Sequence, residues 1–429
     1  MKNFLDVFRK SREINNASWI ISCRIMQMAL SFVVSVISAR FLGPSNYGLI
    51  SYGGAYVAFF SSFCTLGLHS VVVRDIIDDP NDQGKTLGTA LAMRLVSSSM
   101  SILIIAIIVS LVDKGESMTI HVVILCSLML LFQVFDTFNY WFQSRYESKI
   151  SSIAALIAYG LSSVYKIAVL ILQKNVLWFA CATSIDYAFI ALFLYVAYRQ
   201  KKGPSLSISA GKAKSMIKRS YHYILAGMMS VIYGQIDKIM LKHMLDEEAV
   251  GLYSLGTSIN SMWVFVLVAI IDSMYPTILQ LHKTSKEAFE KKNRQLYAIV
   301  IYVSVFVGLV FLLFGKWVIG LLYGQEYLGA AAPLKVIVWY TIFSYLGVAR
   351  NAWIVCENKQ KYLKYMYFAA AVINVVLNFL MIPRWGSIGA AAASLITQIF
   401  TSILLPLCIP ALQPNAKLML EAILLKKVK

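Results

Sequence analysis

The sequence predicts an all-α polytopic membrane protein with about twelve transmembrane helices in two six-helix lobes. Three observations lead to this fold class. Of the 429 residues, 59% are hydrophobic and only 14% are charged, whereas roughly 45–50% and about 25% are usual in soluble globular chains. Twelve apolar stretches approach the length of about 20 residues that crosses a bilayer core. The basic residues gather in alternate connections between these stretches.

The first six spans form an N-terminal lobe, residues 1–198. The first apolar stretch is too long for the apolar region of a signal peptide, and no small-residue cleavage site follows it. We therefore expect it to remain as a spanning helix. The six spans are expected at residues 17–38, 47–70, 89–111, 120–142, 152–172 and 177–198.

A basic linker at residues 199–221, the most polar stretch of the chain, separates this lobe from a C-terminal lobe, residues 222–429. The second lobe ends in a polar tail. Its six spans are expected at residues 222–244, 253–275, 296–314, 332–354, 365–383 and 388–410.

The distribution of Lys and Arg predicts that both termini and the linker are cytoplasmic. Segments on the side of the N-terminus hold 27 of these residues, and loops on the other side hold 5. Cytoplasmic loops carry such an excess in membrane proteins. Contact with anionic membrane lipids therefore accounts for most of the net charge of +18. The same distribution argues against a nucleic-acid partner.

The two lobes resemble each other as parallel repeats. Residues 42–51 (LGPSNYGLIS) and residues 245–254 (LDEEAVGLYS) share the pattern L-x5-G-L-x-S at an offset of 203 residues. Each motif follows an odd-numbered span, so both lobes enter the membrane in the same direction. Repeats of this kind place a substrate site between the lobes.

Gly43, Pro44 and Gly48 predict a structural turn between the first two spans, because proline fixes the backbone and glycine permits a tight reversal. The G-x4-G spacing matches half of a P-loop, but no Lys-Ser/Thr pair follows it, so nucleotide binding is not supported. The six cysteines show neither CxxC nor Cys/His metal spacing. No catalytic Ser/His/Asp or HExxH arrangement is present, so we expect no metal, no other cofactor and no enzyme.

Charged residues inside the expected spans are the candidates for function. Each costs on the order of 2.5–3.5 kcal/mol near mid-bilayer and must face a wet cavity or a partner. An excess of cations suits the path of an anionic head group. The candidate cations of such a cavity are Arg24, Lys166, Lys238, Lys242 and Arg350.

Two alternatives apply to these charges. Cations near a membrane face, such as Arg94, Arg350 and Lys242, can extend to the head groups by snorkelling. Asp237 and Asp272 are candidates for coupling transport to a gradient of H⁺ or Na⁺, and pairing with a basic neighbour is the competing interpretation.

Three motifs carry a family resemblance. Ala39–Gly48 reads ARFLGPSNYG, Leu66-Gly67-Leu68 is followed by Arg74-Asp75, and Ile382-Pro383 precedes Gly386–Ala391, which reads GSIGAA. These residues resemble the ARxLGPxxYG signature, the second landmark and the last turn of Wzx-type polysaccharide (O-antigen/capsule) repeat-unit flippases. That family belongs to the superfamily of MATE-like MOP exporters, so the resemblance implies a MATE-like fold.

The resemblance implies a bacterial inner-membrane protein that flips undecaprenyl-pyrophosphate-linked oligosaccharide outward, for capsule or for O antigen in lipopolysaccharide biosynthesis. It also implies ion antiport, and we expect a polysaccharide polymerase with its chain-length complex as a partner. The alternative is an ion-coupled MATE-like exporter of drugs or other small molecules, which would depend on carboxylates in its cavity. A membrane-embedded glycosyltransferase would need a large outer loop, but the longest, residues 315–331, carries only Lys316 and Glu326 as charges.

Overall fold

The computed structural model describes residues 12–424. It describes their side chains except those of residues 12–22, 24, 223, 225, 226, 229, 230, 232 and 233. The described residues form helices and contain no strand, which confirms the predicted all-α class. The chain divides into two compact units: unit 1 is Met1–Leu42 with Tyr52–Val231, and unit 2 is Gly43–Ser51 with Ile232–Lys429.

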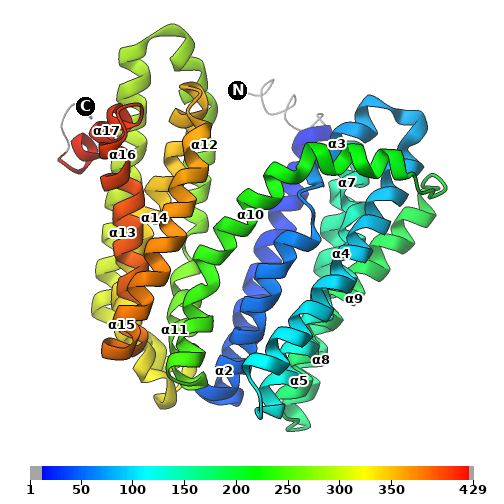
Figure 1. The fold of residues 1–429 in the computed structure, drawn as a ribbon, viewed down its shortest axis with the longest axis horizontal. Coiled ribbons are helices and arrows are strands. Elements are labelled where there is room, and N and C mark those ends of the chain that lie inside the picture. The colour runs from blue at the N-terminus through cyan, green and yellow to red at the C-terminus, as the bar shows by residue number, and fades with distance from the viewer. Residues whose placement is uncertain (1–11, 425–429) are drawn as a thin grey trace, which may run out of the picture. The chain divides into compact units, whose positions relative to one another are not determined.

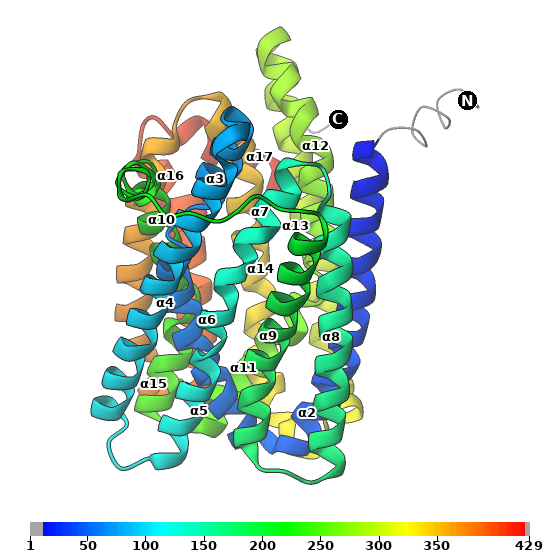
Figure 2. The ribbon, with the colours of Figure 1, turned by 90° about the vertical axis from the view of Figure 1, so that its right-hand side faces the viewer.

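Unit 1 contains most of helix α2 and the helices up to the first part of α10. The helices α8 and α9 run side by side as an antiparallel pair (Figure 2). The elements are α2 (Arg12–Cys64), α3 (His69–Asp78), η1 (Pro80–Asp82), α4 (Gln83–Val112), α5 (Ser117–Ser127), α6 (Met129–Gln133), η2 (Val134–Asp136), α7 (Thr137–Ser144), α8 (Ser148–Ile171) and α9 (Val176–Gln200).

Helix α10 (Ala210–Met244) begins in unit 1 and ends in unit 2. Within unit 2, α14 packs against both α13 and α15 (Figure 1). The remaining elements are α11 (Glu247–Ser261), α12 (Phe265–Thr284), α13 (Lys286–Tyr323), η3 (Gln325–Ala330), α14 (Ala331–Cys356), η4 (Gln360–Tyr362), α15 (Leu363–Ile399), the π-helical η5 (Phe400–Leu404), α16 (Leu405–Cys408) and α17 (Gln413–Ile423).

The helices are those of a multi-pass membrane protein. Among the described residues, nine helices are long and apolar enough to cross a membrane. Two of these stretches, Ile25–Asp78 and Gln360–Cys408, far exceed the length of about 20 residues that one crossing needs. Each is interrupted by a glycine with positive φ, Gly43 at 71° and Gly386 at 58°. The total of twelve spans stays a prediction, as does a lobe boundary at the linker.

Exposed apolar side chains identify surfaces that lipid must solvate. On α4, Leu103, Ile107 and Leu111 recur every fourth residue and are 62%, 51% and 72% exposed. Residues at this spacing lie on one helix face. A stripe of this kind would be a liability in water, but it is the expected surface of a helix in a bilayer.

The two repeat motifs meet inside unit 2. A Cβ atom on Gly48 would lie 1.8 Å from the carbonyl oxygen of Glu247, and one on Gly251 would lie 2.0 Å from the carbonyl oxygen of Pro44. Gly48 and Gly251 are equivalent positions of the motifs, since they differ by 203 residues. The two segments therefore approach so closely that only glycine, which has no Cβ, fits at either position.

We predict that Gly48→Ala and Gly251→Ala each destabilise the protein by roughly 1–3 kcal/mol, because an overpacked contact forces the backbones apart. Thermal unfolding of the purified protein in detergent measures the effect. Gly54→Ala is the matched control, since no atom lies within 4 Å of a Cβ at that position. Equal melting temperatures for all three variants would show that the contact tolerates a methyl group.

Candidate functional site

Asp237 on α10 is the centre of a buried polar cluster in unit 2. Its side chain is 3% exposed. The Tyr253 hydroxyl on α11 donates to Oδ2 at 2.5 Å, and the Ser394 hydroxyl on α15 donates to the same oxygen at 2.6 Å. Nδ2 of Asn378, also on α15, donates to Oδ1 at 2.6 Å. Three donors from two other helices converge on this side chain, so it links α10 with α11 and α15.

The cluster continues along α15. Nδ2 of Asn378 also donates to Oδ1 of Asn374 at 3.0 Å, and Nδ2 of Asn374 donates to Oγ of Ser394 at 3.2 Å. The two asparagines precede the kink at Gly386 and Ser394 follows it, so Asp237 bridges both parts of the bent helix. Oδ1 of Asn378 is buried, and no described residue donates a hydrogen bond to it. An acceptor without a donor lies beside a carboxylate, which is an arrangement that a cation or a protonated group would satisfy.

A cavity of about 250 Å³ adjoins this cluster. Its wall contains the Asp237 side chain together with many hydroxyl and amide groups, and the described lining includes no Lys or Arg. One wall is fixed by the hydrogen bond from Nδ2 of Asn260 to Oγ1 of Thr341, at 2.7 Å. The polar lining residues are Asp237, Tyr253, Thr257, Asn260, Ser261, Tyr340, Thr341, Ser344, Tyr345 and Ser394.

The other predicted site residues of unit 2 have different surroundings. Lys238 is half-buried next to Asp237 on α10. Lys242 is buried, and its Nζ lies 2.6 Å from Oε1 of Glu247. Arg350 is buried on α14 and donates to the carbonyl oxygen of Thr401 at 3.2 Å, where the π-helical η5 widens the last span. Asp272 on α12 is exposed and lies outside the Asp237 cluster.

In unit 1, Lys166 on α8 is half-buried, and its Nζ lies 5.4 Å from the centre of the Tyr159 ring. Arg24 belongs to α2, but its side chain lies outside the described residues. The turn motif belongs to unit 2, where Gly43 adopts φ 71°, Pro44 begins the helical segment that follows, and Gly48 makes the close contact with Glu247 described above. Asp237, Lys238 and Lys242 share α10, whereas Lys166, Asp272 and Arg350 lie on other helices.

Arg94 on α4 is a buried cation whose environment the sequence does not predict. Its side chain is 1% exposed, so the snorkelling interpretation is wrong. Nη2 donates to the carbonyl oxygen of Gln133 at 2.8 Å, and Nη1 donates to Oγ1 of Thr137 at 2.9 Å. The fourth expected span is broken there into α6, η2 and α7. Arg94 therefore satisfies a carbonyl at the break, where the regular helical hydrogen bonds are interrupted.

Part of the Asp237 cluster had a signal in the sequence. Asn374 and Asn378 are four residues apart in an apolar span, which places two amides on one helix face. Polar groups inside a membrane span are costly and indicate a site. Tyr253 and Ser394 carried no such signal, because tyrosine and serine are common throughout these helices.

Comparison with known proteins identifies relatives. The model of the family described as "Polysaccharide biosynthesis protein" matches residues 14–282, and the MatE family model matches residues 223–380. The capsular polysaccharide biosynthesis protein CapF of Staphylococcus aureus is 20% identical over 391 residues, which cover 90% of this chain and 96% of CapF. The probable low-salt glycan biosynthesis flippase Agl15 of Haloferax volcanii is 19% identical over 398 residues, 89% of this chain and 80% of Agl15.

Among solved structures, the inward-facing conformation of a multidrug resistance MATE family transporter of the MOP superfamily has the same fold. The TM-score is 0.69 at 14% sequence identity, over 91% of this chain and 94% of that one. This likeness confirms the MATE-like fold.

We predict that Arg94→Met, which keeps the stem and removes the guanidinium, lowers the free energy of unfolding. The carbonyl of Gln133 and the hydroxyl of Thr137 would lose a buried partner, at a cost of roughly 1–3 kcal/mol. Arg199→Met, at an exposed position, should change stability by no more than about 0.5 kcal/mol. Unfolding in a denaturing detergent measures both, and equal stabilities would contradict a structural role for Arg94.

Proposed function

The chain belongs to the polysaccharide biosynthesis protein family, and from this membership we propose that it flips undecaprenyl-pyrophosphate-linked oligosaccharide repeat units across the bacterial inner (plasma) membrane. The family match over residues 14–282 carries this proposal. The relatives named for capsule synthesis and for glycan flipping support a transporter of polysaccharide precursors rather than a catalytic enzyme. The exported units would then be joined by a separate polymerase with its chain-length complex.

The proposed topology has twelve spans with both termini in the cytoplasm. The ratio of 27 to 5 basic residues between the two sides supports this orientation. The nine candidate helices, with the two longest each divided at a kink, account for eleven spans. The second part of α10, which ends at Met244, is proposed as the twelfth.

We propose that Arg24 and Lys238, with Lys166, guide the pyrophosphate by alternating access through a cationic cavity. The guanidinium of arginine binds two phosphate oxygens at once, which suits first capture. Lys242 and Arg350 were candidates for the same path. Their contacts with Glu247 and with the Thr401 carbonyl support a role in holding unit 2 together instead.

Arg24→Ala and Lys238→Ala should therefore each slow polysaccharide export. A charge-assisted hydrogen bond is worth about 1.5–3 kcal/mol, so loss of one predicts a decrease of about tenfold or more. Arg24→Lys should retain part of the activity, because it keeps the positive charge. The rest should be lost with the bidentate hydrogen bonding of the guanidinium. The measurement is surface polysaccharide in a strain that depends on this chain, at matched protein levels.

Lys174→Ala removes a charge at an exposed position and is the control for that experiment. Normal export by both alanine variants would remove the cationic path and leave the family assignment intact.

We further propose that an H⁺ or Na⁺ gradient drives the cycle through Asp237. The carboxylate, the unpaired Oδ1 of Asn378 and the hydroxyl-rich cavity beside them offer oxygen atoms to a small cation. Hard cations prefer oxygen ligands. Asp272 was the other candidate, and its exposed position outside the cluster does not favour it.

Asp237→Asn should make flipping in proteoliposomes insensitive to the ion gradient, because an amide can neither take up a proton nor offer a negative charge to Na⁺. Asp272→Asn removes the same charge from an exposed position and should keep the gradient dependence. Melting curves of both variants establish that the fold survives. Full gradient dependence in Asp237→Asn would assign coupling to another group.

A MATE-like exporter of small molecules is the second candidate, and the MatE match over residues 223–380 favours it. A single strain that lacks the chain distinguishes the two functions. Loss of the chain should remove surface polysaccharide in the first case, whereas in the second it should lower resistance to exported compounds and leave the polysaccharide unchanged.

A further inference from the structure

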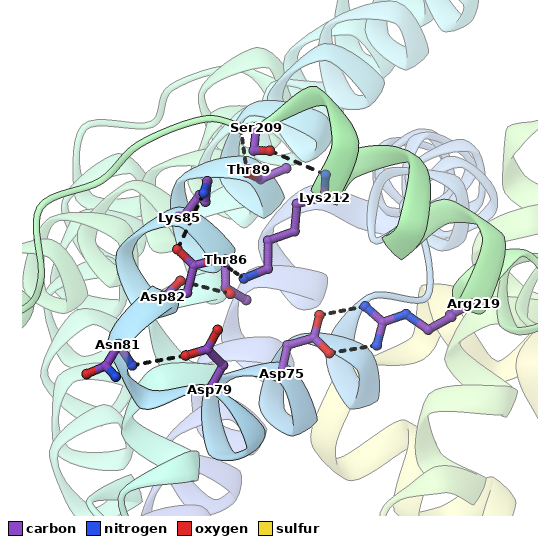
Figure 3. Close-up of polar contacts among 10 residues, drawn as sticks. All are labelled: Asp75, Asp79, Asn81, Asp82, Lys85, Thr86, Thr89, Ser209, Lys212 and Arg219. Carbon is purple, nitrogen blue, oxygen red and sulfur yellow. Dashed lines mark hydrogen bonds and ion pairs between the residues drawn. The ribbon is translucent and has the colours of Figure 1, made fainter.

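The segment at residues 203–221, called the docked segment below, packs on α3, η1 and α4 within unit 1. Its backbone lies against α4 at two glycines: a Cβ on Gly84 would be 2.1 Å from the carbonyl oxygen of Ser205, and one on Gly88 would be 2.3 Å from that of Ser207. The backbone N–H of Ser207 donates to the carbonyl of Gly84 at 3.3 Å. Ser209 N–H donates to Oγ1 of Thr89 at 3.0 Å (Figure 3).

Two ion pairs fasten the helical part of the docked segment. Nη1 and Nη2 of Arg219 each lie 2.6 Å from an oxygen of Asp75, and Nζ of Lys212 lies 2.7 Å from Oδ2 of Asp82 (Figure 3). Lys212 and Arg219 are seven residues apart, as are Asp75 and Asp82. Seven residues are close to two helical turns, so both cations point from one face of α10 toward α3 and η1.

The opposite face of the docked segment is both basic and apolar. Lys214, Ile217, Lys218 and Tyr221 are all exposed, and each lies three or four residues from two of the others. Residues with this spacing form one stripe along a helix. Ile208 in the preceding loop is 72% exposed. Residues 199–221 contain seven Lys and Arg and no acidic residue, and Asp82 and Asp75 pair with Lys212 and Arg219 on the other face of the helix.

We propose that this outward stripe is a binding surface for anionic lipid head groups, with Ile217 and Tyr221 inserted at the level of the acyl-chain boundary. A helix with cations beside apolar side chains lies in the plane of the membrane interface. Anionic lipids attract such cations near the surface. The docked segment thereby anchors the beginning of α10, the helix that carries Lys238 and Asp237 further along. This anchor does not depend on which substrate the protein carries.

The test uses the full chain in nanodiscs of phosphatidylcholine, with and without phosphatidylglycerol. Amide hydrogen exchange across residues 206–221 should be slower in the anionic nanodiscs, by about fivefold for each lysine engaged. Both faces of a nanodisc have the same lipids, so the result does not depend on the orientation proposed above. Lys214→Gln with Lys218→Gln should abolish the difference between the two lipid mixtures.

Lys361→Gln with Lys364→Gln removes the same charge from exposed positions in unit 2 and should leave the difference intact. Exchange that is equal in both lipid mixtures would overturn the proposal. A lipid difference that survives in Lys214→Gln/Lys218→Gln would also overturn it, because the stripe would not be its source. Slowing by inorganic phosphate in detergent, without any effect of phosphatidylglycerol, would assign the surface to a soluble anion instead.

Discussion

The cost of burying a charge among apolar helices determines how these helices meet. Asp237 is almost inaccessible, and burial of an ionised carboxylate is tolerated only when hydrogen bonds replace water. Its donors come from α11 and from both sides of the kink in α15. The contact between α10 and α11 and the bend of α15 therefore both depend on the Asp237 side chain. Arg94 has the corresponding role in unit 1, where it donates hydrogen bonds to residues on both sides of the break between α6 and α7.

A second constraint is the close approach of backbones at glycine. Gly48 and Gly251 let the two repeat motifs touch within unit 2, although one motif comes from the first half of the chain. Gly84 and Gly88 similarly admit the backbone of residues 205–207. In both places the contact is between main chains. It therefore depends on glycine having no side chain, and the identity of the residue that supplies the carbonyl matters little.

The charged residues divide by what surrounds them. Lys242, Arg350, Lys212 and Arg219 have acidic or carbonyl partners and hold elements together. Asp237 has its partners too, but a buried acceptor that no described residue satisfies and a polar cavity lie beside it, which sets it apart from these structural charges. Lys214 and Lys218 are exposed on the other face of the helix, and neither forms an ion pair with a residue that the structure describes.

Composition, the length of the apolar stretches and the quoted motifs by themselves determined the all-α membrane class and the polysaccharide flippase family. These properties can be read from each segment separately, because each span must be apolar enough to cross the bilayer whatever helices surround it. The sequence also singled out Asp237 and the motif glycines. Only the tertiary structure decided that Asp237 meets Tyr253, Asn378 and Ser394, that Arg94 is buried instead of snorkelling, and that Gly48 faces Gly251. The physical reason is that a buried charge or a close backbone contact is satisfied by residues distant in sequence, and one helix alone does not specify which partner it will meet.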